Sequence, residues 1–152
     1  MAAQTILTMM GNTVTIAGYP GQFLKKWRVY VATLVRDAVV NSIVQAQMQI
    51  DPNAAPFLAV GIHAGDTADT RVLTTQEDWF INAQDNQNGY NWANGYIPRT
   101  ALCGAREFGL NFPDEFAIKS NTRITFSIQN MAAAPVAGTA TISLRGWQLV
   151  AV

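Results

Sequence analysis

The chain has 152 residues, of which 49% are hydrophobic and 13% are charged, and its ten Lys and Arg residues balance its ten Asp and Glu residues. This length fits one domain of about 100–200 residues, which can bury a core without metal or disulfide cross-links. Val, Ile and Thr together number 37, whereas Glu and Lys together number six, which disfavours a helical bundle. Because a net charge of zero favours association, we expect the chain to contact other subunits.

Individual residues disfavour several further classes of protein. No apolar run reaches the roughly 18 residues that a membrane helix needs, so we expect no membrane contact. The single cysteine, Cys103, excludes an internal disulfide framework and is expected to be a small buried residue. The single histidine, His63, excludes any site built on two imidazoles. We therefore expect no enzyme, no metal site and no cofactor, and the lack of a basic footprint predicts no nucleic-acid partner.

The first part of the chain contains two predicted strands. Residues 1–24 are expected to form an N-terminal arm or a first edge strand, followed by a β-sandwich domain at 25–152. Thr13–Ile16 alternates between polar and apolar residues, and a glycine-rich turn follows. Trp27–Val35 carries apolar residues on both alternating faces, which predicts a strand with both faces at least partly covered. Residues 35–44 fit a short helix as well as an extended segment.

The middle of the chain predicts four more strands. Val44–Ile50 alternates apolar residues with three glutamines, as in a strand with one buried face. Phe57–Ile62 is a continuous apolar run, which predicts a central strand. Thr70–Thr75 and Trp79–Ala83 are two further predicted strands, joined by a polar bend.

Residues 84–104 are expected to form a long loop, because two Asn-Gly-Tyr triplets surround a tryptophan there. Strand patterns resume at Phe116–Lys119, Thr122–Gln129 and Thr139–Leu149. Short strands throughout, without a strong helix, predict an all-β fold: a single β-sandwich that is jelly-roll-like.

The charges are unevenly distributed along the chain. All ten acidic residues lie between Asp37 and Glu115, where three arginines leave a net charge of −7, and the two flanks together carry +7. These opposite charges meet either within one subunit or between neighbouring subunits, where complementary charge sets the register of contact.

Several of these segments resemble a known class of protein. They are the alternating strand Gln45–Ile50 with its Asp-Pro turn, the apolar run Phe57–Ile62, the segment Ile118–Phe126, and Ile142–Trp147 with its closing Arg-Gly-Trp step. Over residues 43–149 the chain resembles the small β-sandwich accessory proteins of tailed-phage virions, the capsid decoration or cement class. The resemblance implies a structural protein on the capsid surface that binds the capsid lattice and copies of itself, and has no catalytic residues.

The loop aromatics Tyr90, Trp92 and Tyr96 are the first candidate contact residues. They could anchor in a neighbouring subunit's pocket, as interface hot spots do, or fold back over one open end of the sandwich. They could also stack on a sugar ring while nearby asparagines bond its hydroxyls. If they bind a sugar, the alternative function is a carbohydrate- or receptor-binding β-sandwich module of a phage tail or head fibre, with a glycan as partner.

The basic cluster Lys25, Lys26 and Arg28, beside Trp27, is the second candidate contact region. It is either a charged edge that discourages wrong strand pairing or part of an arm that clamps onto an acidic neighbour. As a nucleic-acid contact it is short and isolated.

A third cluster contains His63, Asp66, Asp69 and Asp78. Three carboxylates could hold a calcium ion, since hard cations bind several oxygens. The spacing lacks the regular ladder of ligands found in calcium loops, which favours a solvated acidic loop.

Overall fold

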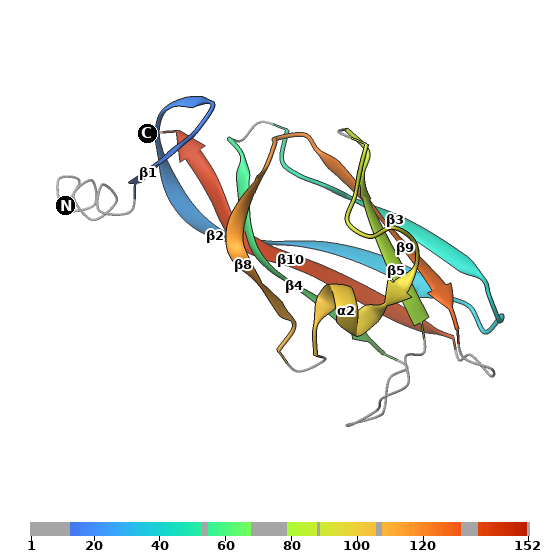
Figure 1. The fold of residues 1–152 in the computed structure, drawn as a ribbon. Helices are drawn as coiled ribbons and strands as arrows, with labels where there is room; N and C mark the ends of the chain where they lie inside the picture. Colours follow the sequence, from blue (N-terminus) through green and yellow to red (C-terminus); the bar gives the residue numbers. More distant parts are fainter. Residues whose placement is uncertain are drawn as a thin grey trace.

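The computed structural model describes residues 13–52, 55–67, 79–87, 89–105, 108–131 and 137–151. Two antiparallel sheets pack face to face (Figure 1). Sheet A has the strand order β1-β2-β10-β4-β8, and sheet B has the order β3-β9-β5-β6, with β7 also paired to β5. The elements are β1 (Thr13–Ile16), β2 (Tyr19–Arg36), β3 (Ile43–Gln49), β4 (Phe57–Asp66), β5 (Trp79–Asp85), β6 (Tyr90–Asn91), β7 (Ile97–Pro98), α2 (Arg99–Cys103), β8 (Leu110–Ile118), β9 (Arg123–Asn130) and β10 (Gly138–Ala151).

From β2 to β10, each of the longer strands lies in the opposite sheet to the one before it. β2, β4, β8 and β10 lie in sheet A, whereas β3, β5 and β9 lie in sheet B. β10 is inserted between β2 and β4, and β9 between β3 and β5. This interleaved order is that of a jelly roll, so the predicted all-β sandwich is confirmed. Among the described residues, no helix is long and apolar enough to cross a lipid bilayer.

The prediction of a long loop over residues 84–104 is wrong at both of its ends. β5 continues to Asp85, and the last part forms the short helix α2. Pro98 precedes this helix and Gly104 follows it with φ at 71°, the usual order of proline at the start and glycine at the end. Between β2 and β3 the chain turns without a helix. The predicted strand Thr70–Thr75 lies outside the described residues.

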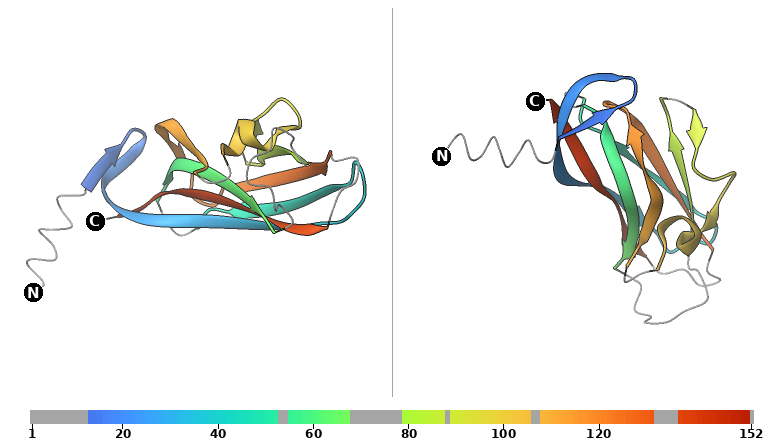
Figure 2. Two further views of the ribbon diagram at one scale, coloured as in Figure 1. Left: turned by 90° about the horizontal axis from the view of Figure 1, so that it is seen from below. Right: turned by 60° about the vertical axis from the view of Figure 1, so that its left-hand side comes forward.

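The start of the sandwich extends further toward the N-terminus than residue 25. β2 runs without a break from Tyr19 to Arg36, and β1 pairs with its first residues. Figure 2 shows that this hairpin curls at one end of sheet A. There it forms a small second core around the buried side chains of Phe23, Leu58 and Leu149. Residues 13–24 are therefore part of sheet A, and residues 1–12 lie outside the described part of the chain.

The main core fills the space between the sheets. Alternate residues of β9 and β10 point inward and are fully buried, among them Phe126, Ile128 and Leu144. Each such side chain contributes about 1.5–3 kcal/mol relative to remaining exposed. Cys103, on α2, is 1% exposed and packs in this core, as expected for a small buried residue.

Sheet A contains a β-bulge that explains the Arg-Gly-Trp step. The register between β10 and β4 shifts so that Arg145 lies opposite Gly61 and Gly146 opposite Ala59, which leaves Val60 as the extra residue. A Cβ atom on Gly146 would overlap the carbonyl oxygen of Leu58. Glycine is therefore required at this position because two backbones approach closely.

A buried ion pair links the two sheets at one end of the sandwich. The guanidinium of Arg36 on β2 contacts the carboxylate of Asp66 on β4, and both side chains are at most 3% exposed. Trp79 donates its indole N–H to Asp66 (2.8 Å), and Arg36 donates to the side-chain oxygen of Asn130 (2.8 Å). Because these partners come from β2, β4, β5 and β9, the cluster connects strands of both sheets.

Tyr30 gives the fold a dependence on alkaline pH. Its hydroxyl donates to Gln148 Oε1 (2.6 Å) and accepts the backbone N–H of Asp51 (3.1 Å), and burial raises its pKa above the usual 10.0. The unfolded chain then loses this proton first, so the free energy of unfolding falls as pH rises above about 10. We expect a smaller fall in Tyr30→Phe. Urea titrations between about pH 9 and 11 measure it, and equal slopes in both proteins would contradict this origin.

Candidate interaction surface

Exposed apolar side chains are concentrated in one stretch of the chain. The described residues include ten large apolar side chains that are exposed, and seven of these lie between residues 27 and 43. We call these seven the apolar stripe: Trp27, Val29, Val31, Val35, Val39, Val40 and Ile43. The stripe follows β2, continues through the turn after it, and ends at the first residue of β3.

The stripe exists because β2 is apolar on both of its faces. Tyr30, Ala32 and Leu34 point inward and are at most 7% exposed, whereas Val31 and Val35 point outward and are 53% and 72% exposed. The sequence predicts a strand with both faces at least partly covered. Within the single chain only the inner face is buried. The outer valines therefore follow the sequence pattern of a buried strand face, although nothing within the single chain covers them.

One end of the stripe is held by an aromatic pair. The rings of Trp27 and Trp147 lie opposite each other on β2 and β10 and meet edge to face, with their centroids 5.1 Å apart. The ammonium of Lys25 lies 5.7 Å from the Trp147 ring and bonds Glu115 of β8 (3.2 Å). Trp27 is still 53% exposed. Its ring is thus positioned by contacts on one side while the other side remains open.

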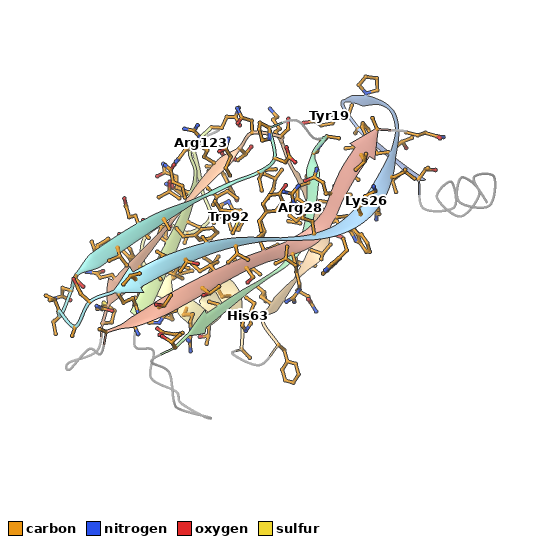
Figure 3. The ribbon with its side chains drawn as sticks, turned by 180° about the vertical axis from the view of Figure 1, so that it is seen from behind. Tyr19, Lys26, Arg28, His63, Trp92 and Arg123 are labelled. Atoms are coloured by element: carbon orange, nitrogen blue, oxygen red, sulfur yellow. The ribbon has the colours of Figure 1, made fainter. Side chains whose placement is uncertain are left out.

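The basic cluster beside Trp27 is largely neutralised within the chain. Lys25 pairs with Glu115, and Arg28 pairs with Asp51 (3.1 Å), while Lys26 is exposed. Figure 3 labels Lys26 and Arg28 among the side chains. Together with the buried pair of Arg36, each of these bonds joins a cation of the positive flank to a carboxylate of the acidic middle. For these three pairs, the opposite charges noted in the sequence meet within one subunit.

The outer face of sheet B has the opposite character. After Ile43, the outward side chains of β3 are three glutamines, of which Gln45 bonds Ser127 (2.9 Å) and Gln49 bonds Asn121 (2.8 Å). Gln47 lies between them, opposite Thr125 in the register of β3 and β9. We call this surface the amide face. The molecule therefore presents a mainly polar outer face on sheet B, whereas β2 presents apolar side chains on the outer face of sheet A.

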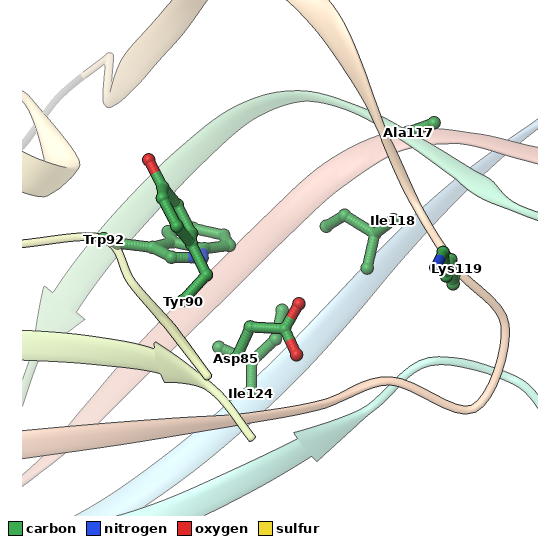
Figure 4. Close-up of a pocket in the computed structure, with 7 residues that line it drawn as sticks. All are labelled: Asp85, Tyr90, Trp92, Ala117, Ile118, Lys119 and Ile124. Carbon is green, nitrogen blue, oxygen red and sulfur yellow. The ribbon is translucent and has the colours of Figure 1, made fainter. Parts of the chain in front are cut away.

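The aromatic loop forms one wall of a pocket at the open side of the sandwich. The pocket has a volume of about 450 Å³, and its lining includes Tyr90, Trp92, Asp85 and Lys119. Figure 4 shows the two aromatic rings on one side of the pocket and Lys119 across from them. Trp92 also packs edge to face on buried Phe126, at 6.2 Å. Trp92 thus partly covers the core, while Tyr90 is 66% exposed.

Tyr96 and His63 do not join this pocket. Tyr96 is half-buried and is not among the residues that line the pocket. His63 lies on β4 opposite Ser143, on the outer face of sheet A, whereas Asp66 points inward to Arg36. His63 and Asp66 therefore face opposite sides of the sheet. Asp69 and Asp78 lie outside the described residues.

Comparisons with protein-family models, with curated proteins and with solved structures gave no significant match for this chain. The outward valines of β2 were not candidates on sequence grounds, although the two-sided apolar pattern of Trp27–Val35 contained the signal. Asp85 and Lys119 were also missed, because only the fold brings them beside Tyr90.

Proposed function

We propose that this chain is a structural virion protein that decorates or cements a tailed-phage capsid and stabilises the head through subunit–subunit contacts. The apolar stripe is the observation that carries the proposal. Several large apolar side chains exposed along one strand and the turn after it are typical of a protein–protein contact. Covering it contributes about 25 cal/mol for each Å² of apolar surface removed from water. On this proposal the chain resides at the capsid surface, with capsid protein and copies of itself as partners.

Two further features support this function. Jelly rolls recur in viral capsid proteins, although a fold does not by itself define a function. The Arg-Gly-Trp step, on which the likeness to decoration proteins partly rests, is a structural feature of the sheet: Arg145 lies over Gly61 and donates to Asn111 (2.6 Å). That arrangement orders the outer face of sheet A next to the stripe.

Binding to heads assembled without this chain tests the proposed function. We expect the purified protein to bind such heads in sedimentation and to raise the temperature at which they rupture. Val29→Lys combined with Val35→Lys should reduce both effects, because lysine ammonium groups resist burial at the stripe. Gln84→Lys, an exposed position on the amide face, is the matched control and should bind like the wild type. Heads that neither bind the wild type nor become more stable would contradict the proposal.

A second candidate function is glycan binding in the pocket beside Tyr90. Exposed and half-exposed aromatic rings, a carboxylate and an ammonium line this pocket, and a pyranose can stack on such rings while it bonds the charged groups. The chain would then be a carbohydrate- or receptor-binding module of a tail or head fibre.

Tyr90→Ala tests glycan binding with little effect on the core. Losing one stacked ring should weaken binding about 3- to 10-fold, which corresponds to about 0.5–1.5 kcal/mol. Phe108→Ala is the control, because Phe108 is 80% exposed and does not line the pocket. A glycan array followed by calorimetry measures both variants. If no glycan binds the wild type, or if the two variants bind equally, this second function is wrong.

A further inference from the structure

The edge of sheet A formed by β2 lacks a neighbouring strand over the last two thirds of its length. β1 pairs with β2 only as far as Leu24, and β10 pairs with the other side of β2 up to Arg36. From residue 25 to residue 36, the side of β2 that faces away from β10 meets no strand in the described part of the chain. Backbone N–H and C=O groups on such an edge can pair with another strand.

Within this free edge, residues 29–35 lack the usual protection against pairing, whereas Lys25, Lys26 and Arg28 lie before them. Residues 29–35 contain neither a charged residue nor a proline. The charges at their two ends are engaged elsewhere: Arg28 pairs with Asp51, and Arg36 is buried against Asp66. Natural proteins commonly block a free edge with charges, prolines or bulges, and their absence from this segment marks it as a site of strand addition.

We infer that the occupant of this edge is a second copy of the chain, paired antiparallel through residues 29–35 of β2. The inference rests on the proposed function, which includes contacts between copies of the chain, and it places those contacts at this edge of β2. The segment is self-complementary, because an antiparallel pairing centred on Ala32 places Val29 opposite the partner's Val35 and Val31 opposite the partner's Thr33. Such a pairing obeys a two-fold axis and joins the two copies of sheet A into one continuous sheet.

This pairing also creates contacts between the outward side chains of the two copies. Because the two-fold axis keeps corresponding faces on the same side, the outward valines of one copy meet those of the other across the new strand pair. Opposed β-branched side chains in antiparallel strands each contribute roughly 0.2–1 kcal/mol. The arginines at the segment ends retain their own carboxylates, so the pairing brings no unpaired charge to its ends.

Sedimentation of the purified chain, without heads, tests this inference. We expect a concentration-dependent dimer, and Val31→Lys should return the mass to the 16.5 kDa of one chain. The variant places a lysine near the centre of the contact in each copy, so the dissociation constant should rise at least about tenfold. Val31 is exposed in the single chain, so the variant should fold normally. A circular dichroism spectrum and unfolding midpoint like those of the wild type, measured at a concentration where the wild type is monomeric, confirm this. Gln84→Lys should remain dimeric.

A second variant tests the register. Val31→Cys combined with Thr33→Cys should form an intermolecular disulfide under mild oxidation, because these positions face each other across the proposed axis. Cys103 is buried and does not compete. A wild type that remains monomeric, or a dimer that survives Val31→Lys, would overturn the inference. If a monomeric wild type binds heads and Val31→Lys does not, the capsid lattice covers the edge instead. A dimer that binds no heads contradicts the proposed function and leaves this inference intact.

Discussion

Asp66→Asn is expected to lower the free energy of unfolding by about 3–5 kcal/mol, because it leaves a buried guanidinium without its counter-charge. Arg36 is 3% exposed, and its carboxylate partner is the acceptor for the Trp79 indole as well. The amide keeps the shape of the side chain, so the loss reports on charge. Urea unfolding followed by tryptophan fluorescence measures the effect.

The same substitution at a solvent-exposed ion pair is the control. Asp51→Asn removes the partner of Arg28, whose side chain is 42% exposed, and should cost no more than about 1 kcal/mol. Replacing both buried partners, with Arg36→Met and Asp66→Leu, should recover part of the stability, because no buried charge then remains unpaired. A loss below about 1 kcal/mol in Asp66→Asn would contradict the assigned role of the pair.

Gly146→Ala is expected to destabilise the fold by about 3 kcal/mol, at the upper end of the usual overpacking cost. The added methyl group would overlap the backbone of Leu58 at the bulge, and a backbone carbonyl moves less easily than a side chain. β10 is central in sheet A, so the displacement would disturb its pairing with β4. Thermal and urea unfolding measure the loss.

Gly65→Ala in the same sheet is the matched control, and its expected effect has the opposite sign. The nearest heavy atom to the new methyl group would be His63 Cε1 at 3.8 Å, an ordinary contact. Alanine is favoured over glycine within a strand by roughly 0.5–1 kcal/mol, so this variant should match or exceed the wild type. Equal losses in both variants would show that the close approach at Gly146 is not what requires glycine.

Alternation in the sequence predicts the fold where one face of a strand is polar. Val44–Ile50 and Thr139–Leu149 each match an observed strand within two residues at either end. α2 is missed because it is too short for helical periodicity, although Pro98 and Gly104 bracket it. The outer valines of β2 are harder to interpret, because apolar residues on both faces predict burial without identifying what covers them.

The ion pairs and the pocket could not be predicted from sequence patterns, because their residues are distant in the sequence. Lys25 and Glu115 are 90 positions apart, and they meet because β2 and β8 lie in the same curved sheet. Asp85 and Lys119 approach Tyr90 only once the two sheets have packed. The uneven charge of the chain was visible in the sequence, but the choice between pairing within and between subunits depended on the strand order.

The central place of β10 in sheet A has a consequence for synthesis. β10 is made after every other strand of the sandwich, yet it pairs with β2 over 14 residue positions and separates β2 from β4. During translation, the growing chain therefore exposes both edges of β2 from residue 25 to residue 36, where β1 does not pair with it. Pairings between residues distant in sequence also form slowly. Nascent chains are thus most prone to aggregate before β10 emerges, and expression should improve with slower synthesis or with chaperones that shield exposed strand edges.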